Sequence, residues 1–216
     1  MSQALVEEYI QTGDAKALES LLETNPALAT ELTSHQVSPL MLACYYKKPE
    51  LAVIVAKYLT NISFYESASI NRIDLVAKHL HQSPNLIEEF SSDGFTGLGL
   101  AAYFGNEDVT RYFLLNGSDP NIPSQNGYNV FPIHSAIANN HIIIVKMLLE
   151  SGANVNVKQM AAVTPLHSAA KNGNIELIIL LLEAGADITV EMEGGKIPAD
   201  LAAEQGFAEL AKILSL

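Results

Sequence analysis

The sequence predicts an all-α solenoid of about seven copies of one helix-turn-helix unit. The clearest copy reads TPLHSAAKNGNIELIILLLEAGAD from Thr164 to Asp187. Its first position recurs along the chain at spacings of 34, 24, 34, 35, 33 and 33 residues, at Ala4, Ser38, Ile62, Thr96, Phe131, Thr164 and Ile197. Periods near 33 residues are typical of arrays in which each unit buries its apolar face against its neighbours.

Local signals place two helices in each copy. Thr96 and Thr164 suit the cap of the first helix, and Pro165 suits its first position, where the missing N–H costs nothing. Left-handed glycines are expected to end this helix at Gly105, Gly173 and Gly206. The second helix carries apolar residues at helical spacing, as in Leu177, Leu181 and Leu182. It is expected to stop at Gly117, Gly152 and Gly185.

These units resemble the ankyrin repeat, whose pattern begins G-x-T-P-L-H-x-A-A-x-x-G. The match is nearly full at Thr164–Asp187 and good at Gly94–Asn121 and Pro132–Asn156. The copy that starts at Ile197 is worn, as expected of a terminal unit. The resemblance implies one ankyrin-repeat domain over residues 1–216, with short β-hairpin fingers between successive helix pairs.

The first copies are weaker, but a second period of 58 residues supports them. Leu21–Ala29 corresponds to His79–Ile87 at that offset, which indicates an internal duplication of a two-repeat unit. The 24-residue step leaves no room for a finger between the second and third units. Longer links around Pro26 and Pro84 replace the compact turn of the other copies.

Composition favours a folded, soluble chain, with 49% apolar residues and no apolar run of membrane-spanning length. The first eight residues lack the basic start of a secretory signal. The single cysteine, Cys44, fits a small buried slot and a reducing compartment. We therefore expect a cytoplasmic protein without membrane association.

The net charge of the chain indicates which kinds of partner it can attract. The net charge is −12 and basic runs are absent from the sequence, which disfavours binding to nucleic acid. A protein partner with a basic patch would be steered toward the chain. The alternative is that the charge only keeps the protein soluble.

The residues do not suggest catalysis, a metal site or a cofactor. The resemblance implies structural hydrogen bonds for His134 and His167. His79 and His81 would point about 200° apart on a helix, and neither Cys nor a carboxylate cluster completes a metal site around them. An enzyme or small-molecule binder is therefore disfavoured.

In ankyrin arrays, the partner surface is the concave side, formed by fingertips and the exposed face of the first helices. The positions before the helix-ending glycine and at the fingertips are the candidates. The predicted partner-binding residues are Tyr45, Tyr46, Ser69, Ile70, Tyr103, Phe104, Gln125, Asn126, Tyr128, Asn139, Met160, Lys171 and Asn172. Ser92, Asp93, Ala161 and Glu193 are further fingertip positions.

The aromatic pairs Tyr45–Tyr46 and Tyr103–Phe104 have two interpretations. Aromatic side chains offer a large contact area at low entropic cost, which is typical of interface anchors. The same side chains could instead pack on adjacent repeats, particularly beside the missing finger.

The functional hypothesis is a non-catalytic protein–protein interaction module: an adaptor, scaffold or inhibitor. A host-directed effector and a self-associating structural protein are the alternatives. We expect a monomer. Weak end-to-end association would use the closing helix, through Leu210, Ile213, Leu214 and Leu216.

Overall fold

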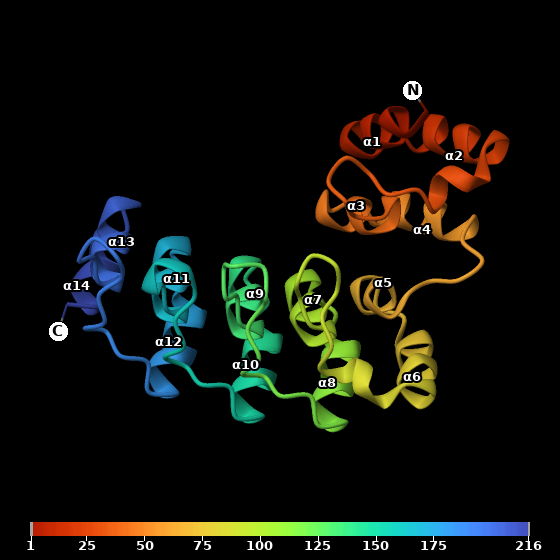
Figure 1. Ribbon diagram of the computed structural model, residues 1–216. Helices are drawn as coiled ribbons and strands as arrows, with labels where there is room; N and C mark the ends of the chain where they lie inside the picture. Colours follow the sequence, from red (N-terminus) through yellow and green to blue (C-terminus); the bar gives the residue numbers. More distant parts are fainter. Residues whose placement is uncertain (1, 216) are drawn as a thin grey trace. The chain divides into compact units, whose positions relative to one another are not determined.

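The computed structural model describes residues 2–215. Within that range, fourteen α-helices form seven consecutive pairs, as the repeat predicts (Figure 1). The chain divides into two compact units, one ending at Gln82 and the other beginning at Ser83. A single domain over residues 1–216 stays a prediction, and the two units are described separately.

The amino-terminal unit holds three helix pairs. Its first helices pack in order, α1 on α3 and α3 on α5, and α2 packs on α4. Its elements are α1 (Ser2–Thr12), α2 (Ala15–Thr24), the 3₁₀-helix η1 (Pro26–Ala29), α3 (Pro39–Tyr45), α4 (Pro49–Lys57), α5 (Phe64–Ser69) and α6 (Ile73–Gln82). The predicted link at Pro26 is therefore a short 3₁₀-helix.

Residues 58–63 connect α4 to α5 directly, which confirms the missing finger. Glu66, buried in the first turn of α5, joins the start of α5 to the start of α3. Its carboxylate accepts hydrogen bonds from the backbone N–H of Ser63 at 2.8 Å and from the hydroxyl of Ser38 at 2.5 Å. The cap of α5 is therefore Ser63, one residue after the slot predicted at Ile62.

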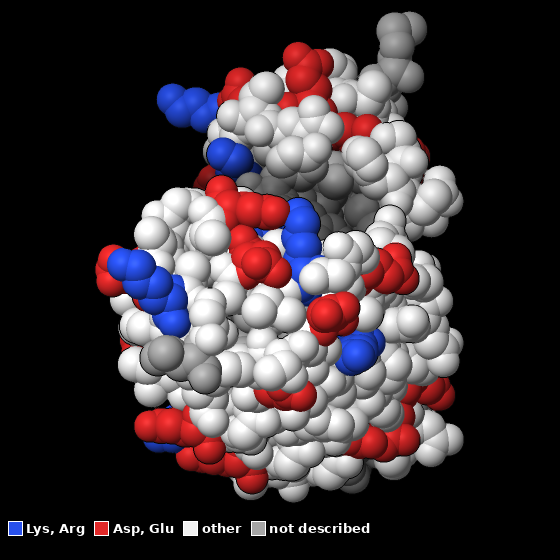
Figure 2. Space-filling view, turned by 90° about the vertical axis from the view of Figure 1, so that its left-hand side faces the viewer, with Lys and Arg blue, Asp and Glu red and all other residues white. Residues whose placement is uncertain are grey.

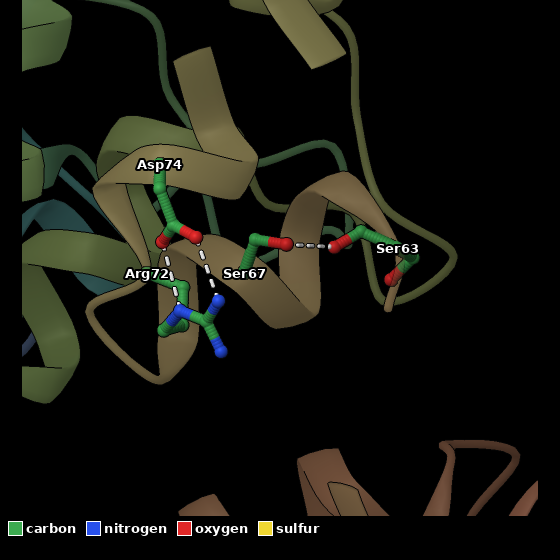
Figure 3. Close-up of polar contacts among 4 residues, drawn as sticks. All are labelled: Ser63, Ser67, Arg72 and Asp74. Atoms are coloured by element: carbon green, nitrogen blue, oxygen red, sulfur yellow. Dashed lines mark hydrogen bonds and ion pairs between the residues drawn. The ribbon is translucent and has the colours of Figure 1, made fainter. Parts of the chain in front are cut away.

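Figure 3 shows the polar contacts around α5 and the start of α6. The Ser67 hydroxyl donates to the Ser63 carbonyl oxygen at 2.7 Å. Arg72 donates two hydrogen bonds to Asp74, at 2.8 and 2.6 Å, and this contact lowers the pKa of Asp74 to about 2. The pair is exposed, so its contribution to stability is small.

The carboxy-terminal unit holds four helix pairs. The inner helices α7, α9, α11 and α13 pack in succession, and α8, α10 and α12 form a second row (Figure 1). Its elements are η2 (Pro84–Ile87), α7 (Gly97–Phe104), α8 (Glu107–Leu115), α9 (Pro132–Ala138), α10 (Ile142–Glu150), η3 (Met160–Ala162), α11 (Pro165–Asn172), α12 (Ile175–Glu183), α13 (Pro198–Glu204) and α14 (Ala208–Ile213).

The fingers of this unit are hydrogen-bonded turns. Each closes with a backbone hydrogen bond of 2.9 to 3.0 Å, in 91–95, 124–130, 159–163 and 192–196. They are so short that the described residues form only an isolated bridge, between Phe90 and Thr96, in place of β-strands. The 124–130 finger is two residues longer than the others, which agrees with its predicted alteration.

The closing helix differs from its prediction. We expected Leu210 and Leu214 to be exposed, but both are buried, because α14 and the residue that ends it pack on α13. Only Ile213 remains exposed, and Leu216 lies outside the described residues. Two of the four residues predicted to form an apolar end are therefore not available for end-to-end association.

The two histidines in the repeat slots, His167 and His134, differ in whether the residue that caps their helix bonds Nδ1. Thr164 caps α11, and its backbone N–H and hydroxyl reach Nδ1 of His167, at 3.2 and 2.8 Å. Phe131 holds the equivalent slot of α9 and makes no side-chain cap. Nδ1 of His134 is therefore buried without a hydrogen-bond partner among the described residues.

We expect Phe131→Thr to be more stable than Phe131→Val by about 1 kcal/mol, because only threonine supplies the cap and a partner for His134 Nδ1. Valine matches threonine in shape, so the comparison isolates the hydroxyl from the loss of the ring. Urea unfolding of both variants measures the difference. Equal stability would contradict this account of the cap.

Left-handed glycines follow the helices as predicted, and the one after the inner helix α11, Gly173, differs in its surroundings from the one after the outer helix α8, Gly117. Gly173 has φ of 67°, and a Cβ there would lie 2.4 Å from the Phe207 ring. Gly117 has φ of 86°, with no heavy atom within 4 Å of an added Cβ. Both positions need the left-handed conformation, but only at Gly173 would a side chain also collide with a neighbour, the Phe207 ring.

Gly117→Ala should lower the unfolding free energy by about 1 kcal/mol through backbone strain alone. Gly173→Ala should cost at least about 1 kcal/mol more, since Phe207 must also move. Thermal unfolding of the two variants tests the order, and an equal loss at both positions would show that the Phe207 contact is unimportant.

Candidate protein-binding surface

Backbone hydrogen bonds join the fingertips of the carboxy-terminal unit into a continuous ridge. The N–H of Gln125 donates to Gly94 at 2.8 Å, that of Met160 to Tyr128 at 2.8 Å, and that of Glu193 to Ala161 at 2.9 Å. Each bond crosses from one finger to the next. We call residues 91–95, 124–130, 159–163 and 192–196 the fingertip ridge.

Two predicted partner-binding residues lie next to each other on this ridge. Tyr128 and Met160 are 55% and 51% exposed, and the backbone bond just described holds them in adjacent fingers. Single exposed apolar side chains are common on protein surfaces, so what distinguishes Tyr128 and Met160 is that they adjoin each other. They form the most accessible apolar feature of the ridge.

The finger that carries Met160 is also strained. Ala161 and Ala162 have φ of 61° and 58°, in the left-handed region that disfavours side chains. The equivalent positions of the next finger are Gly194 and Gly195, which adopt such angles without a Cβ penalty. Strain of this kind is found most often at functional sites.

Other predicted residues make internal contacts. The Asn139 side chain donates to the Tyr103 carbonyl oxygen at 3.0 Å, and that of Asn172 to Ile137 at 3.1 Å. The Asn126 amide reaches the Asp93 carbonyl oxygen at 3.3 Å. These amides therefore hold adjacent repeats in position relative to each other. Of the predicted partner-binding residues, Asn172, Gln125 and Lys171 are exposed.

The aromatic pair on α7 is partly engaged. The rings of Tyr103 and Phe104 meet edge to face, with centroids 5.1 Å apart, and both side chains are half-buried. They lie on the inner-helix row of the same unit as the fingertip ridge. Both packing and partner contact are consistent with this geometry.

The remaining predicted residues belong to the amino-terminal unit. Tyr46 is exposed, whereas Tyr45 and Ile70 are half-buried. Ser69 was predicted to face a partner, but its side chain is buried, and its hydroxyl donates to the Tyr65 carbonyl oxygen at 2.8 Å. Ser69 is therefore excluded from the surface.

The histidines in the repeat slots make structural bonds. Nε2 of His134 lies 3.0 Å from the Val163 carbonyl oxygen, and Nε2 of His167 lies 3.1 Å from that of Lys196. Each histidine thus reaches the finger of the following repeat. His79 bonds the Ile62 carbonyl oxygen at 2.9 Å. Over residues 2–215, the structure brings no three metal-ligating side chains together.

Two asparagines missed by the sequence analysis also join the repeats. Asn121 donates to the Gly152 carbonyl oxygen at 3.0 Å and accepts from the Asn154 N–H at 2.8 Å. Asn156 makes the same pair of contacts with Gly185 and Asp187, at 3.0 and 2.9 Å. The recurrence of Asn at the end of two G-x-x-x-N turns was the available signal.

Comparisons with known proteins agree with this architecture. The family model "Ankyrin repeats (3 copies)" matches residues 64–159, and "Ankyrin repeats (many copies)" matches residues 152–202. The chain belongs to the ankyrin repeat family. Ankyrin repeats are protein–protein interaction modules, and no helix in the described part of the chain is long and apolar enough to cross a membrane.

Individual ankyrin relatives share only part of their length with this chain. It is 27% identical over 118 residues to alpha-latrocrustotoxin-Lt1a of Latrodectus tredecimguttatus, covering 40% of this chain and 8% of the toxin. It is 37% identical over 59 residues to an ankyrin repeat-containing protein of Schizosaccharomyces pombe, covering 27% and 28%. The human DNA-binding protein RFXANK is 33% identical over 64 residues, covering 30% and 25%. The chain thus spans less than a third of each relative.

The burial of His134 makes the stability of the protein depend on pH. Desolvation lowers the pKa of His134 from 6.5 to about 4. As the pH falls below 6.5, the unfolded state takes up a proton before the folded state does, so stability is lost between about pH 6.5 and pH 4. The loss from this group alone should approach about 3 kcal/mol.

We therefore expect His134→Gln, which does not titrate, to flatten the pH dependence of the unfolding free energy between pH 6.5 and 4. Urea unfolding across this range measures it. His167, whose pKa burial also lowers, should keep a residual slope. An unchanged slope in the variant would contradict the account.

Proposed function

We propose that this chain is a non-catalytic adaptor, scaffold or inhibitor that binds a protein partner on its fingertip ridge and the adjoining inner-helix row. The observation that carries the proposal is the exposed pair Tyr128 and Met160, held in register by a backbone hydrogen bond between two fingers. A pre-organised apolar pair lowers the entropic cost of association and is typical of an interface anchor.

The strained finger supports this assignment. Left-handed alanines at 161 and 162 cost about 1 kcal/mol or more each, and glycine would remove the cost, as in the next finger. Alanine at both positions is understandable if the methyl groups at the tip contact a partner. We infer that Ala161, which is half-buried, adjoins Met160 at the centre of the interface.

Charge supports a basic partner. The net charge is −12, and acidic side chains are spread more widely than basic ones over the face drawn in Figure 2. Complementary charge raises association rates and selects partners more than it raises affinity. We infer that association with the partner weakens as salt rises.

The test compares variants of the intact chain in affinity capture from lysate of the source cells, followed by affinity measurement with the captured protein. Tyr128→Ala with Met160→Ala should weaken binding at least about 30-fold, or about 2 kcal/mol, as for hot-spot residues. Tyr103→Ala with Phe104→Ala distinguishes the two interpretations of the α7 aromatic pair.

Val53→Ala is the matched control, because Val53 is an exposed apolar residue on α4, which belongs to the other compact unit and is not part of the fingertip ridge. It should leave the affinity unchanged. If the Tyr128 and Met160 variant folds and binds like the wild type, the ridge is not the interface and the proposal is wrong.

A further inference from the structure

We propose that α10 and α12 carry a second docking surface, which takes a basic amphipathic helix of a partner protein. The surface is centred on Ile143, Ile175 and Ile179, and we call these residues the outer isoleucine surface. They lie on the outer helices, apart from the fingertip ridge in the fold, so the inference does not depend on the proposed function.

The three isoleucines are largely exposed. Their exposed fractions are 53% for Ile143, 62% for Ile175 and 51% for Ile179. Helices α10 and α12 pack on each other, and Ile175 and Ile179 stand one turn apart on the same side of α12. The two neighbouring helices therefore present a group of branched apolar side chains to solvent.

The repeat supplies its own comparison, because equivalent positions in other outer helices show what stacking requires. Counted from the start of each outer helix, Ile175 corresponds to Glu107 and to the half-buried Ile142, Ile143 to both Asp108 and Glu176, and Ile179 to Arg111 and Lys146. All of these charged residues are exposed, and their helices have the same length and pack in the same row. The scaffold therefore does not need isoleucine at these positions, and a cluster of exposed apolar residues indicates a binding site.

The surroundings of the outer isoleucine surface are acidic. Helices α8, α10 and α12 carry two bases, and one of them, Lys146, lies 3.9 Å from Glu150. Their five acids, all exposed, are Glu107, Asp108, Glu150, Glu176 and Glu183. An apolar centre with an acidic border matches a helix that has one apolar face flanked by Lys and Arg.

The same charge argues against two other occupants. A second copy of this chain brings the same acidic border and a net charge of −12, so the two surfaces would repel each other. An anionic membrane would be repelled in the same way. A basic amphipathic helix is the occupant whose apolar and charged groups both fit.

The test is an NMR titration of the full chain with a synthetic peptide of about 15 leucines and lysines, spaced to form an amphipathic helix. A peptide of the same composition in scrambled order is the probe control. We expect saturable shifts of backbone amides in α10 and α12 with the amphipathic peptide and not with the scrambled one.

The decisive variant combines Ile143→Glu, Ile175→Glu and Ile179→Lys, each taken from an equivalent repeat position, so folding should be retained and is checked by thermal unfolding. Its net change is one negative charge, which by itself would favour a basic peptide. We expect peptide binding to weaken at least tenfold. Leu115→Glu, at an 80% exposed position on α8, changes the charge equally and should not weaken binding.

Several results would overturn the inference. These are equal binding of the scrambled peptide, shifts that map to the fingertip ridge, or unchanged affinity in the triple variant. Self-association in sedimentation, or binding to phosphatidylglycerol vesicles, that the triple variant abolishes would assign the surface to another occupant. The Tyr128→Ala, Met160→Ala variant should bind the peptide normally, which separates this test from that of the proposed function.

Discussion

The structure depends on one constraint: a pair of short helices cannot bury a core alone, so every unit is held by its neighbours. Apolar stacking supplies most of the stabilisation, and side-chain bonds to the next repeat fix the register. His134, His167, Asn121 and Asn156 all reach backbone groups about one repeat further along the chain. A surface spread over successive repeats is therefore as well ordered as the stack itself.

This constraint separates scaffold from function within each repeat. Positions that touch the neighbouring unit are restricted to caps, small residues, buried aliphatics and the His and Asn side chains that bond the next repeat, whereas side chains at the fingertips and on the outer side of the second helices are freer to vary. Tyr128, Met160 and the three outer isoleucines occupy such free positions. The fold does not require these side chains, which is why we propose that they contact partners.

Much of the fold could be predicted because its signals are local. The cap at Thr164, the left-handed turn at Gly173 and the missing finger all follow from short segments and their spacing. The predictions failed where contacts between helices determine the position or the burial of a residue. The cap of α5 shifted to Ser63 because Glu66 bonds it, and Leu210 and Leu214 turned inward because α14 packs on α13.

The candidate site was less predictable for the same reason. Sequence position identified the ridge residues Tyr128 and Met160, but it could not show that Ser69 is buried or that Asn139 and Asn172 bond adjacent helices. The outer isoleucines carried a signal that comparison between repeats could have found, since charged residues fill five of the six equivalent slots in α8, α10 and α12. Apolar residues on a helix are ordinarily assigned to the core, and only the structure shows these three to be exposed.

Hydrogen–deuterium exchange of the chain with and without its captured partner tests the central claim most directly. The account predicts slower exchange in residues 124–130 and 159–163 when the partner is bound, with the amides of α2 and α4 unchanged. Protection confined to helices outside the fingertip ridge and the inner-helix row would contradict it.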